Sequence, residues 1–598
     1  MNAKRHNQVN SFTPLNSRVH GSKMKKTLNI LISFFLILTY SSCTKDLKTS
    51  SAKILNLYTV DVPGFDPLYT ANISTAKEVA KVYEGLLQYH YLDRPYQLEP
   101  NLAEAMPTVS KDLLTYTFKI KKGVTFHDDP AFPNGKGREL KASDFVYSLK
   151  RVADLKLKSS GWWLFDKRIV GLNEWRNEFA KLEKTNYEKE VPGLKALGPY
   201  TLQFKLTKKY PQFLYALAMA YSFVVPREAV EKYGQDFNFK AVGTGPFTLK
   251  TFVPKSHFHY LRNPNFRPKF FPTTAAPRYL NYLKDYSGKK LPLVDEIKVK
   301  VIMENQTQWL NFLAGKIDYL DIPKDNFESS VISNKLSPEM IKKGIQLEIS
   351  PSQSTMYIAF NQDKSILKNL NLRRAISLSI DIDKYNKLFY NNTGLSAQSV
   401  IPPGLKGHDP NFKNRWKGKN LLKAKEYLKK AGYPNGKGLP TITIDTRART
   451  GLRQKAEFMA NELKSVGIPA KVVTSSYAEF KRRINNREVM LLMYGWIGDY
   501  PDAENCLQLL YGQILPPGTN YAGYNNPEFN RIYAKATIMP DTIERTKLYK
   551  RMNTLVAEQL PWVFTIHMQE YYVFHKHLKN FLKSDFIYGF EQYLDVVK

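Results

Sequence analysis

The chain has 598 residues and a formal net charge of +34, with 88 Lys or Arg against 54 Asp or Glu. Its length exceeds what one hydrophobic core organises and implies two or more domains. The basic excess is compatible with a nucleic acid or an anionic membrane as partner. However, the basic residues are dispersed without a dense block, so we expect solvated surface lysines and no nucleic-acid partner. The 37 Tyr and 34 Phe fit large packed cores and clefts that grip a ligand.

The N-terminal region has the pattern of a secretory signal that ends at Cys43. Two lysines at 25–26 precede a mostly apolar run, residues 28–40, and two serines precede the cysteine. The run is far shorter than the roughly 20 residues that span a bilayer. We therefore expect a signal peptide over residues 24–42, with residues 1–23 as an upstream extension.

The cysteine after small residues resembles the lipobox of bacterial lipoproteins, in which cleavage leaves a lipid-modified N-terminal cysteine. Tyr40 departs from that pattern, where leucine is usual, and an ordinary signal peptide that contains a cysteine is the alternative. The resemblance implies lipidation at Cys43, a tether over 43–53, and a periplasmic or other extracytoplasmic location held by a lipid anchor. Cys506 is the only other cysteine, so lipidation leaves no intramolecular disulfide.

The chain from residue 54 to about 303 predicts a mixture of strands and helices. Period-two apolar residues predict four strands, over 54–62, 115–120, 201–206 and 297–303. A helical period predicts one amphipathic helix over 76–89. It predicts a second helix that bears Phe145 and Leu149, with Ser143 as its cap.

Residues 440–496 predict a β-α-β-α-β succession. Strands are expected over 440–445, 470–474 and 489–496, with helices over 454–466 and 477–484 between them. Such alternation implies a parallel sheet covered by helices. Sheets of this kind bind ligands beyond the carboxyl ends of their strands. The third strand ends at Gly495-Trp496-Ile497-Gly498-Asp499, so topology alone nominates this segment as a site.

Asp499 is the residue of this segment with the clearest chemistry. A carboxylate beside an aromatic ring in a cleft is a receptor for an ammonium group, which it binds through an ion pair and hydrogen bonds. The indole of Trp496 would pack alongside. The alternative is that Asp499 is a solvated loop or helix-cap acid.

Other motifs predict neither a cofactor nor a metal. The phrase Pro-Asn-Gly-Lys-Gly occurs at 133–137 and 434–438 but lacks the spacing and the Ser or Thr of a phosphate loop, so we expect two turns. Two pairs of neighbouring histidines lack a nearby third ligand. Common hydrolase motifs are absent from the sequence. A secreted hydrolase and a surface adhesin that uses the basic charge are the alternatives from other classes.

Ten short phrases follow one another along nearly the whole remaining chain. They are VYEGL at 82–86, TFKIKKGVTFHD at 117–128, ASDFVYSLKR at 142–151, GTGPF at 243–247, RNP at 262–264, AFN at 359–361, RRAISLSID at 373–381, IPPG at 401–404, AGYP at 431–434 and GWIGDYPD at 495–502. In this order and spacing they resemble family 5 of the extracytoplasmic solute-binding proteins of ABC importers, the oligopeptide- and dipeptide-binding type.

The resemblance implies a two-lobed α/β fold of the large, three-domain periplasmic-binding-protein type, with a hinge and an inserted subdomain in the first lobe. We expect lobe I to comprise 54–75, 198–303 and 566–598, the inserted subdomain 76–197, and lobe II 304–565. The resemblance implies no enzymatic chemistry. It implies a monomer that delivers its ligand to an ABC permease in the membrane.

The resemblance also implies roles for single residues. In peptide-binding members the aspartate that matches Asp499 pairs with the ligand's α-ammonium group. The backbone that matches Gly495 and Ile497 hydrogen-bonds the peptide as an added strand, and Trp496 walls the pocket. Some oligopeptide binders carry an arginine where this chain has Met493, so the capture of a ligand carboxylate stays open. We expect a peptide ligand; the alternative is another solute, such as an oligosaccharide, a nickel or haem chelate, or an opine.

Overall fold

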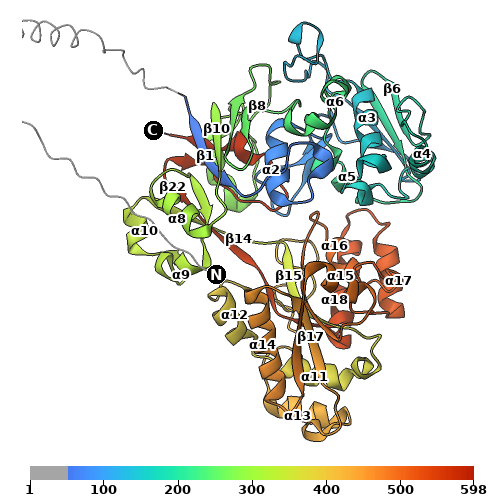
Figure 1. Cartoon of the computed structure of the whole chain (residues 1–598), viewed down its shortest axis with the longest axis vertical. Coiled ribbons are helices and arrows are strands. Elements are labelled where there is room, and N and C mark those ends of the chain that lie inside the picture. The colour runs from blue at the N-terminus through green and yellow to red at the C-terminus, as the bar shows by residue number, and fades with distance from the viewer. Residues whose placement is uncertain (1–51, 598) are drawn as a thin grey trace, which may run out of the picture. The chain divides into compact units, whose positions relative to one another are not determined.

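The computed structural model describes residues 52–597. The expected upstream extension, signal peptide, lipidation site at Cys43 and nearly all of the tether lie outside the described residues. Residues 53–598 form one compact unit, in which the sheets are distributed over two lobes (Figure 1). Among the described residues, no helix has the length and apolar character needed to cross a membrane.

The first lobe, at the top of Figure 1, contains two four-stranded sheets. One has the order β1-β10-β9-β8 (Ile54–Thr59, Glu296–Val301, His257–Arg262, Phe247–Val253), and β1 runs parallel to β10 although they are far apart in the sequence. The other has the order β4-β5-β7-β6 (Thr108–Val109, Thr115–Lys119, Thr201–Lys205, Leu194–Gly198), against which α3 (Ala142–Ala153) packs. One continuous hydrophobic cluster, which includes Phe65 and Phe118, joins the two sheets.

The second lobe is built on the five-stranded sheet β18-β17-β19-β15-β20 (Ala470–Ser475, Ile442–Arg447, Leu491–Ile497, Ser354–Phe360, Trp562–Phe564). The strands β17, β18 and β19 run parallel, which confirms the predicted β-α-β-α-β unit, while β15 runs antiparallel to β19. The connecting helices are α14 (Thr450–Lys464) and α15 (Tyr477–Asn485), close to their predicted ranges. Met459 and Leu463 of α14 are fully buried, as their period predicted.

Two neighbouring chain crossings connect the lobes. Strands β14 (Ile345–Pro351) and β22 (Gln569–His575) pair in the three-stranded sheet β11-β22-β14, with β11 at Tyr319–Asp321. The chain continues from β14 into β15, and it reaches β22 from β20 and β21 (Ile566–His567). The Ser352 N–H donates to the Met568 carbonyl at 2.9 Å, so the two crossings are tied together where a hinge is expected.

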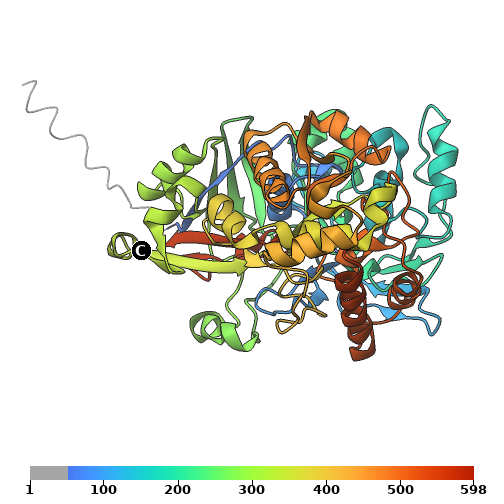
Figure 2. The same cartoon turned by 90° about the horizontal axis from the view of Figure 1, so that it is seen from below.

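The remaining elements cover these sheets or lie at their edges. The other helices are α2 (Ile73–Val82), α4 (Leu172–Ala180), α5 (Phe213–Ala216), α6 (Arg227–Tyr233), α7 (Leu283–Tyr286), α8 (Asn305–Leu313), α9 (Lys324–Ser330), α10 (Pro338–Lys342), α11 (Leu370–Ser379), α12 (Ile382–Tyr390), α13 (Leu421–Lys430), α16 (Glu504–Leu507), α17 (Pro527–Ala536) and α18 (Ile543–Gln559). Short paired strands are β2 (Leu87–Tyr89), β3 (Leu98–Pro100), β12 (Val331–Ile332), β13 (Lys335–Leu336), β16 (Leu395–Ser396), β23 (Leu578–Lys579) and β24 (Asp595–Val596). Figure 2 shows the same arrangement from below.

Two local predictions were wrong. The helix expected over 76–89 begins earlier, where the Asn72 side chain caps α2, and it ends at Val82; its last residues form β2 instead. At Gly85, between α2 and β2, a Cβ would lie 3.0 Å from the Leu217 carbonyl oxygen. Ser143 does not cap α3, because Asp144 accepts the Lys141 N–H at 2.8 Å and the helix already begins at Ala142.

Candidate functional site

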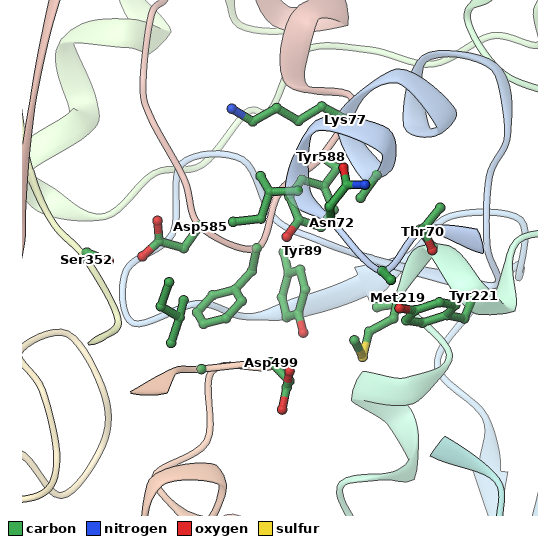
Figure 3. Close-up of a pocket in the computed structure, with 18 of the residues that line it drawn as sticks. Thr70, Asn72, Lys77, Tyr89, Met219, Tyr221, Ser352, Asp499, Asp585 and Tyr588 are labelled. Carbon is green, nitrogen blue, oxygen red and sulfur yellow. The ribbon is translucent and has the colours of Figure 1, made fainter. Parts of the chain in front are cut away.

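A cavity of about 460 Å³ lies between the lobes, at the carboxyl end of β19 (Figure 3). Lobe II contributes Ser352 and the segment 497–499. The opposite wall comes from the start of α2, the segment 218–221 and the C-terminal segment 583–588, together with Tyr89, Trp163, Glu570 and Tyr572. The cavity therefore meets the nominated strand end, as expected for a site of this sheet type.

The Asp499 carboxylate is held by one buried amide. Asn505, which is fully buried, donates from Nδ2 to Asp499 Oδ2 at 3.1 Å and accepts the Asp499 N–H at 3.0 Å on Oδ1. Burial raises the pKa of Asp499 and the Asn505 amide lowers it; among the described residues no cation contributes. The carboxylate is thus positioned and desolvated, and it lacks a positive partner.

Trp496 lies behind this carboxylate. Its ring packs against the core cluster of lobe II, and its Nε1 donates to the same Asn505 Oδ1 at 2.8 Å. Of the segment 495–499, the residues that line the cavity are Ile497, Gly498 and Asp499. Trp496 and Asp499 therefore share one hydrogen-bond partner, Asn505, and the indole packs on the core side of the cavity wall.

The backbone of Gly495 and Ile497 faces an open strand edge. The Gly498 N–H donates toward β15, to the Gln353 carbonyl at 2.8 Å. Backbone groups of successive residues alternate between the two edges of a strand, so Ile497 and Gly495 face away from β15. On that edge β17 pairs only with Leu491 and Leu492. Within residues 52–597 this edge accordingly has no partner strand beyond Leu492, and it can accept an added strand.

A second cavity, of about 320 Å³, lies in lobe II beside this edge, and Ile497 borders both cavities. Met493 and Met356 contribute thioethers, and five tyrosines also line it. Arg447 and Lys455 are its charged groups, and no acidic residue is among those that line it. The Lys455 ammonium lies 3.9 Å from the centre of the Tyr390 ring, so an aromatic face holds it in place.

The lobe I wall carries a compact charged group. Lys583 Nζ lies 3.4 Å from Glu570 and 3.6 Å from Asp585. Asp585 in turn accepts the Gln353 N–H at 2.7 Å, which ties the C-terminal segment to the start of β15. Burial and the nearby Lys583 lower the pKa of Lys77 to about 8. Polar groups thus line both sides of the cavity, and one of them, Asp585, is hydrogen-bonded to Gln353 next to the expected hinge.

The residues predicted from the sequence that border the two cavities are Gly495, Ile497 and Asp499, all of lobe II, and no residue of lobe I was predicted. Tyr89 is 4% exposed, its hydroxyl has no hydrogen-bond partner in the described part of the chain, and it points toward Asp499 in Figure 3. Tyr221 and Tyr588 also line this side. These residues come from three distant segments without a common motif, so no pattern in the sequence joins them. No group of three His, Cys, Asp or Glu among residues 52–597 is placed to hold a metal.

The geometry can be compared with known proteins. Residues 97–514 match the family model described as bacterial extracellular solute-binding proteins, family 5 Middle. Heme-binding protein A of Haemophilus influenzae is 24% identical over 557 residues, which are 92% of this chain and 93% of that protein. The dipeptide-binding protein of Escherichia coli is 25% identical over 535 residues, 87% of this chain and 90% of that protein.

A solved structure shares the fold. It is the ABC transporter-associated periplasmic binding protein DppA from Helicobacter pylori in complex with the peptide STSA, which is 23% identical with a TM-score of 0.67 and covers 91% of this chain and 98% of its own. This likeness confirms the expected two-lobed α/β fold of the periplasmic-binding-protein type. The chain belongs to family 5 of the bacterial extracellular solute-binding proteins, a family of binding proteins and not of enzymes.

Proposed function

We propose that this chain is the peptide receptor of an ABC importer and that it binds a short peptide by its free amino group. The observation that supports this most directly is Asp499, a desolvated carboxylate that has no cation beside it within residues 52–597 and that lines a cavity between two lobes. An α-ammonium group supplies the missing charge and up to three hydrogen-bond donors. The dipeptide-binding relative and the peptide-bound neighbour support the same ligand class.

The peptide backbone would pair with Gly495 and Ile497. Residues 495–499 extend over about 13 Å at the usual rise of a strand, so an extended ligand of about two to four residues fits alongside. Its far end then reaches the second cavity, where Arg447 and Lys455 stand without an acidic neighbour. These two cations would bind the terminal carboxylate of the peptide. They would replace the arginine that some oligopeptide binders carry at the position of Met493. Such a ligand is recognised by its main chain and two charged ends, which all short peptides share.

Binding between the lobes would shift the population toward a closed form. A ligand that contacts Asp499 on one lobe and the cavity wall of the other stabilises closure, because the open form cannot make both sets of contacts at once. We propose that the closed receptor, monomeric and tethered through a lipidated Cys43 on the extracytoplasmic side, delivers the peptide to the permease. Tethering raises its effective concentration at the membrane.

Calorimetry with trialanine, N-acetyl-trialanine and trialanine amide tests the proposal. We expect acetylation to weaken binding by at least about 10-fold, since one charge-assisted hydrogen bond contributes about 1.5–3 kcal/mol. Asp499→Asn should weaken trialanine to the same degree and leave no further effect of acetylation. Asp409→Asn, a carboxylate of lobe II outside both cavities, is the matched control and should bind normally.

Two outcomes would contradict the proposal in different ways. Equal affinities for the free and the acetylated peptide would remove Asp499 from amine recognition. No binding of any of the three peptides would reject a peptide ligand of this kind. In that case mass spectrometry of the material that co-purifies with the chain distinguishes an iron porphyrin, for which the similar heme-binding protein A is the precedent, from an oligosaccharide, a nickel chelate or an opine.

A further inference from the structure

Basic residues occur along the whole chain, but they are concentrated in one segment of lobe II. Residues 413–430 carry eight Lys or Arg and one acidic residue, Glu426, which pairs with Lys430. The Trp416 ring packs on Tyr427 of α13 with centroids 5.2 Å apart, so the segment before α13 lies against that helix. Helix α13 itself lies at the lower end of lobe II in Figure 1.

Five of these cations are exposed and have no ion pair in the described part of the chain, and we call them the basic tip. They are Lys413, Arg415, Lys423, Lys425 and Lys429. Two further lysines of the segment are paired with acids, Lys419 with Glu462 and Lys430 with Glu426. With eight basic residues and one acidic residue in 413–430, the basic tip is a local excess of positive charge.

An exposed leucine lies within this excess. Leu422, in the first turn of α13, is 84% exposed, the largest exposed fraction of any large hydrophobic side chain in residues 52–597. Its neighbour Leu421 is 38% exposed. The buried face of α13 is formed by Ala424 and Leu428, so neither leucine is needed for the core contact of the helix. Apolar side chains flanked by lysines are typical of helices that lie at a membrane interface.

We propose that the basic tip contacts an anionic lipid membrane, with Leu422 inserted at the boundary between headgroups and acyl chains. Charge complementarity alone would fit any polyanion. The leucine decides in favour of the membrane, because an aqueous polyanion offers no apolar phase in which to bury it. This inference is independent of the peptide ligand. It agrees with the apolar run at 28–40, which we expect to direct the chain to a membrane.

Vesicle sedimentation tests this contact. The protein used is the chain from Ala52 onward, which lacks the apolar run and keeps the compact unit of residues 53–598. We expect binding to vesicles of phosphatidylglycerol mixed with phosphatidylcholine, loss of binding with added salt, and none to pure phosphatidylcholine. One lysine near an anionic surface is worth about 5-fold in affinity. Lys423→Glu with Lys425→Glu should therefore weaken binding at least about 25-fold.

Matched variants separate the tip from general surface charge. Lys423 and Lys425 lie in the N-terminal half of α13, where acidic residues favour the helix, so the double variant is expected to fold. Lys181→Glu with Lys184→Glu reverses two exposed lysines of the first lobe and should bind as the parent does. Leu422→Ser should weaken binding about 10-fold, whereas Ile543→Ser, a 72% exposed residue of α18, should not.

Two results would overturn the proposal. If the two lysine pairs weaken binding equally, the contact is a property of net charge and not of the tip. If Leu422→Ser binds vesicles as the parent does and heparin is bound as tightly as the vesicles are, the tip binds polyanions in water and not a membrane. The vesicle assay does not depend on a peptide ligand, so a negative result would not contradict the proposed peptide binding.

Discussion

Replacing Asn505 by alanine should disturb both the stability of the protein and its affinity for peptide. The Asn505 amide accepts the Trp496 Nε1–H and the Asp499 N–H and donates to the Asp499 carboxylate, at 2.8, 3.0 and 3.1 Å. Alanine leaves two donors and one carboxylate oxygen without their partner. A buried donor without a partner costs about 1–3 kcal/mol. Because Trp496 and Asp499 are only partly buried and water can reach some of these groups, we expect a loss of about 2–4 kcal/mol.

The same substitution frees the Asp499 carboxylate to take other orientations. Loss of one hydrogen bond to a charged group is worth about 1.5 kcal/mol, so peptide affinity should fall about 10-fold. Calorimetry measures the affinity and differential scanning calorimetry the thermal midpoint. Gln508→Ala is the control, because its amide makes one bond, to the Asn505 carbonyl, and should change neither quantity appreciably. An Asn505→Ala protein with unchanged midpoint and unchanged affinity would refute the role of this amide.

Three further results are expected. Burial raises the pKa of Asp499, so peptide affinity should fall as the pH is lowered through that raised value. The empty protein should lose stability as the pH rises from the ordinary carboxyl pKa to the raised one, because over that range the unfolded chain is ionised and the folded one is not. Calorimetry across a pH series measures both, and the same pH dependence in Asp499→Asn would contradict the role of this carboxyl. Gly495→Ala should weaken peptide binding, since its Cβ would lie 2.2 Å from Met356 Sδ, and adding Met356→Ala should restore much of it, whereas no rescue would mean that the added methyl blocks the ligand instead. Burial also raises the pKa of Cys506, so a thiol reagent at pH 8 should label the chain from Ala52 onward only after denaturation, and labelling of the native protein would contradict the buried thiol.

The parts of the fold that the sequence predicted well are those with strong local periodicity. The unit over 440–496 was recovered because its strands are short apolar runs and α14 repeats buried residues at helical spacing. The prediction of a helix over 76–89 was wrong because of a tertiary contact. Helix α2 ends at Val82, and Gly243 and Gly245 approach the Val82 carbonyl so closely that a Cβ on either glycine would lie 2.1–2.5 Å from its oxygen. Such an approach between distant segments leaves no periodic signal.

The candidate site was predictable on one lobe only. Strand order places the carboxyl end of β19 at the cleft, so Asp499 could be nominated from topology and residue type together. Asn505 gave no signal, because an asparagine after a turn is most often a cap or a solvated amide. Arg447 and Lys455 also gave no signal in the sequence. Arg447 ends β17 and Lys455 lies on α14, and only the fold brings both to the second cavity, which Met493 and Gly495 also line.

One contact between the lobes is made by the residue next to Asp499, the proposed ligand anchor. Tyr500 follows Asp499 and stacks on Tyr215 of α5, in the first lobe, with centroids 5.5 Å apart and planes inclined by 7°. Its hydroxyl is fixed by Glu504 at 2.7 Å. An aromatic pair is worth about 0.5–1.5 kcal/mol beyond its buried area, about 2- to 13-fold in the ratio of closed to open forms. Under the proposed function, a ligand that orders Asp499 would order Tyr500 as well, so amine recognition and lobe closure would act on one short segment, and each should strengthen the other.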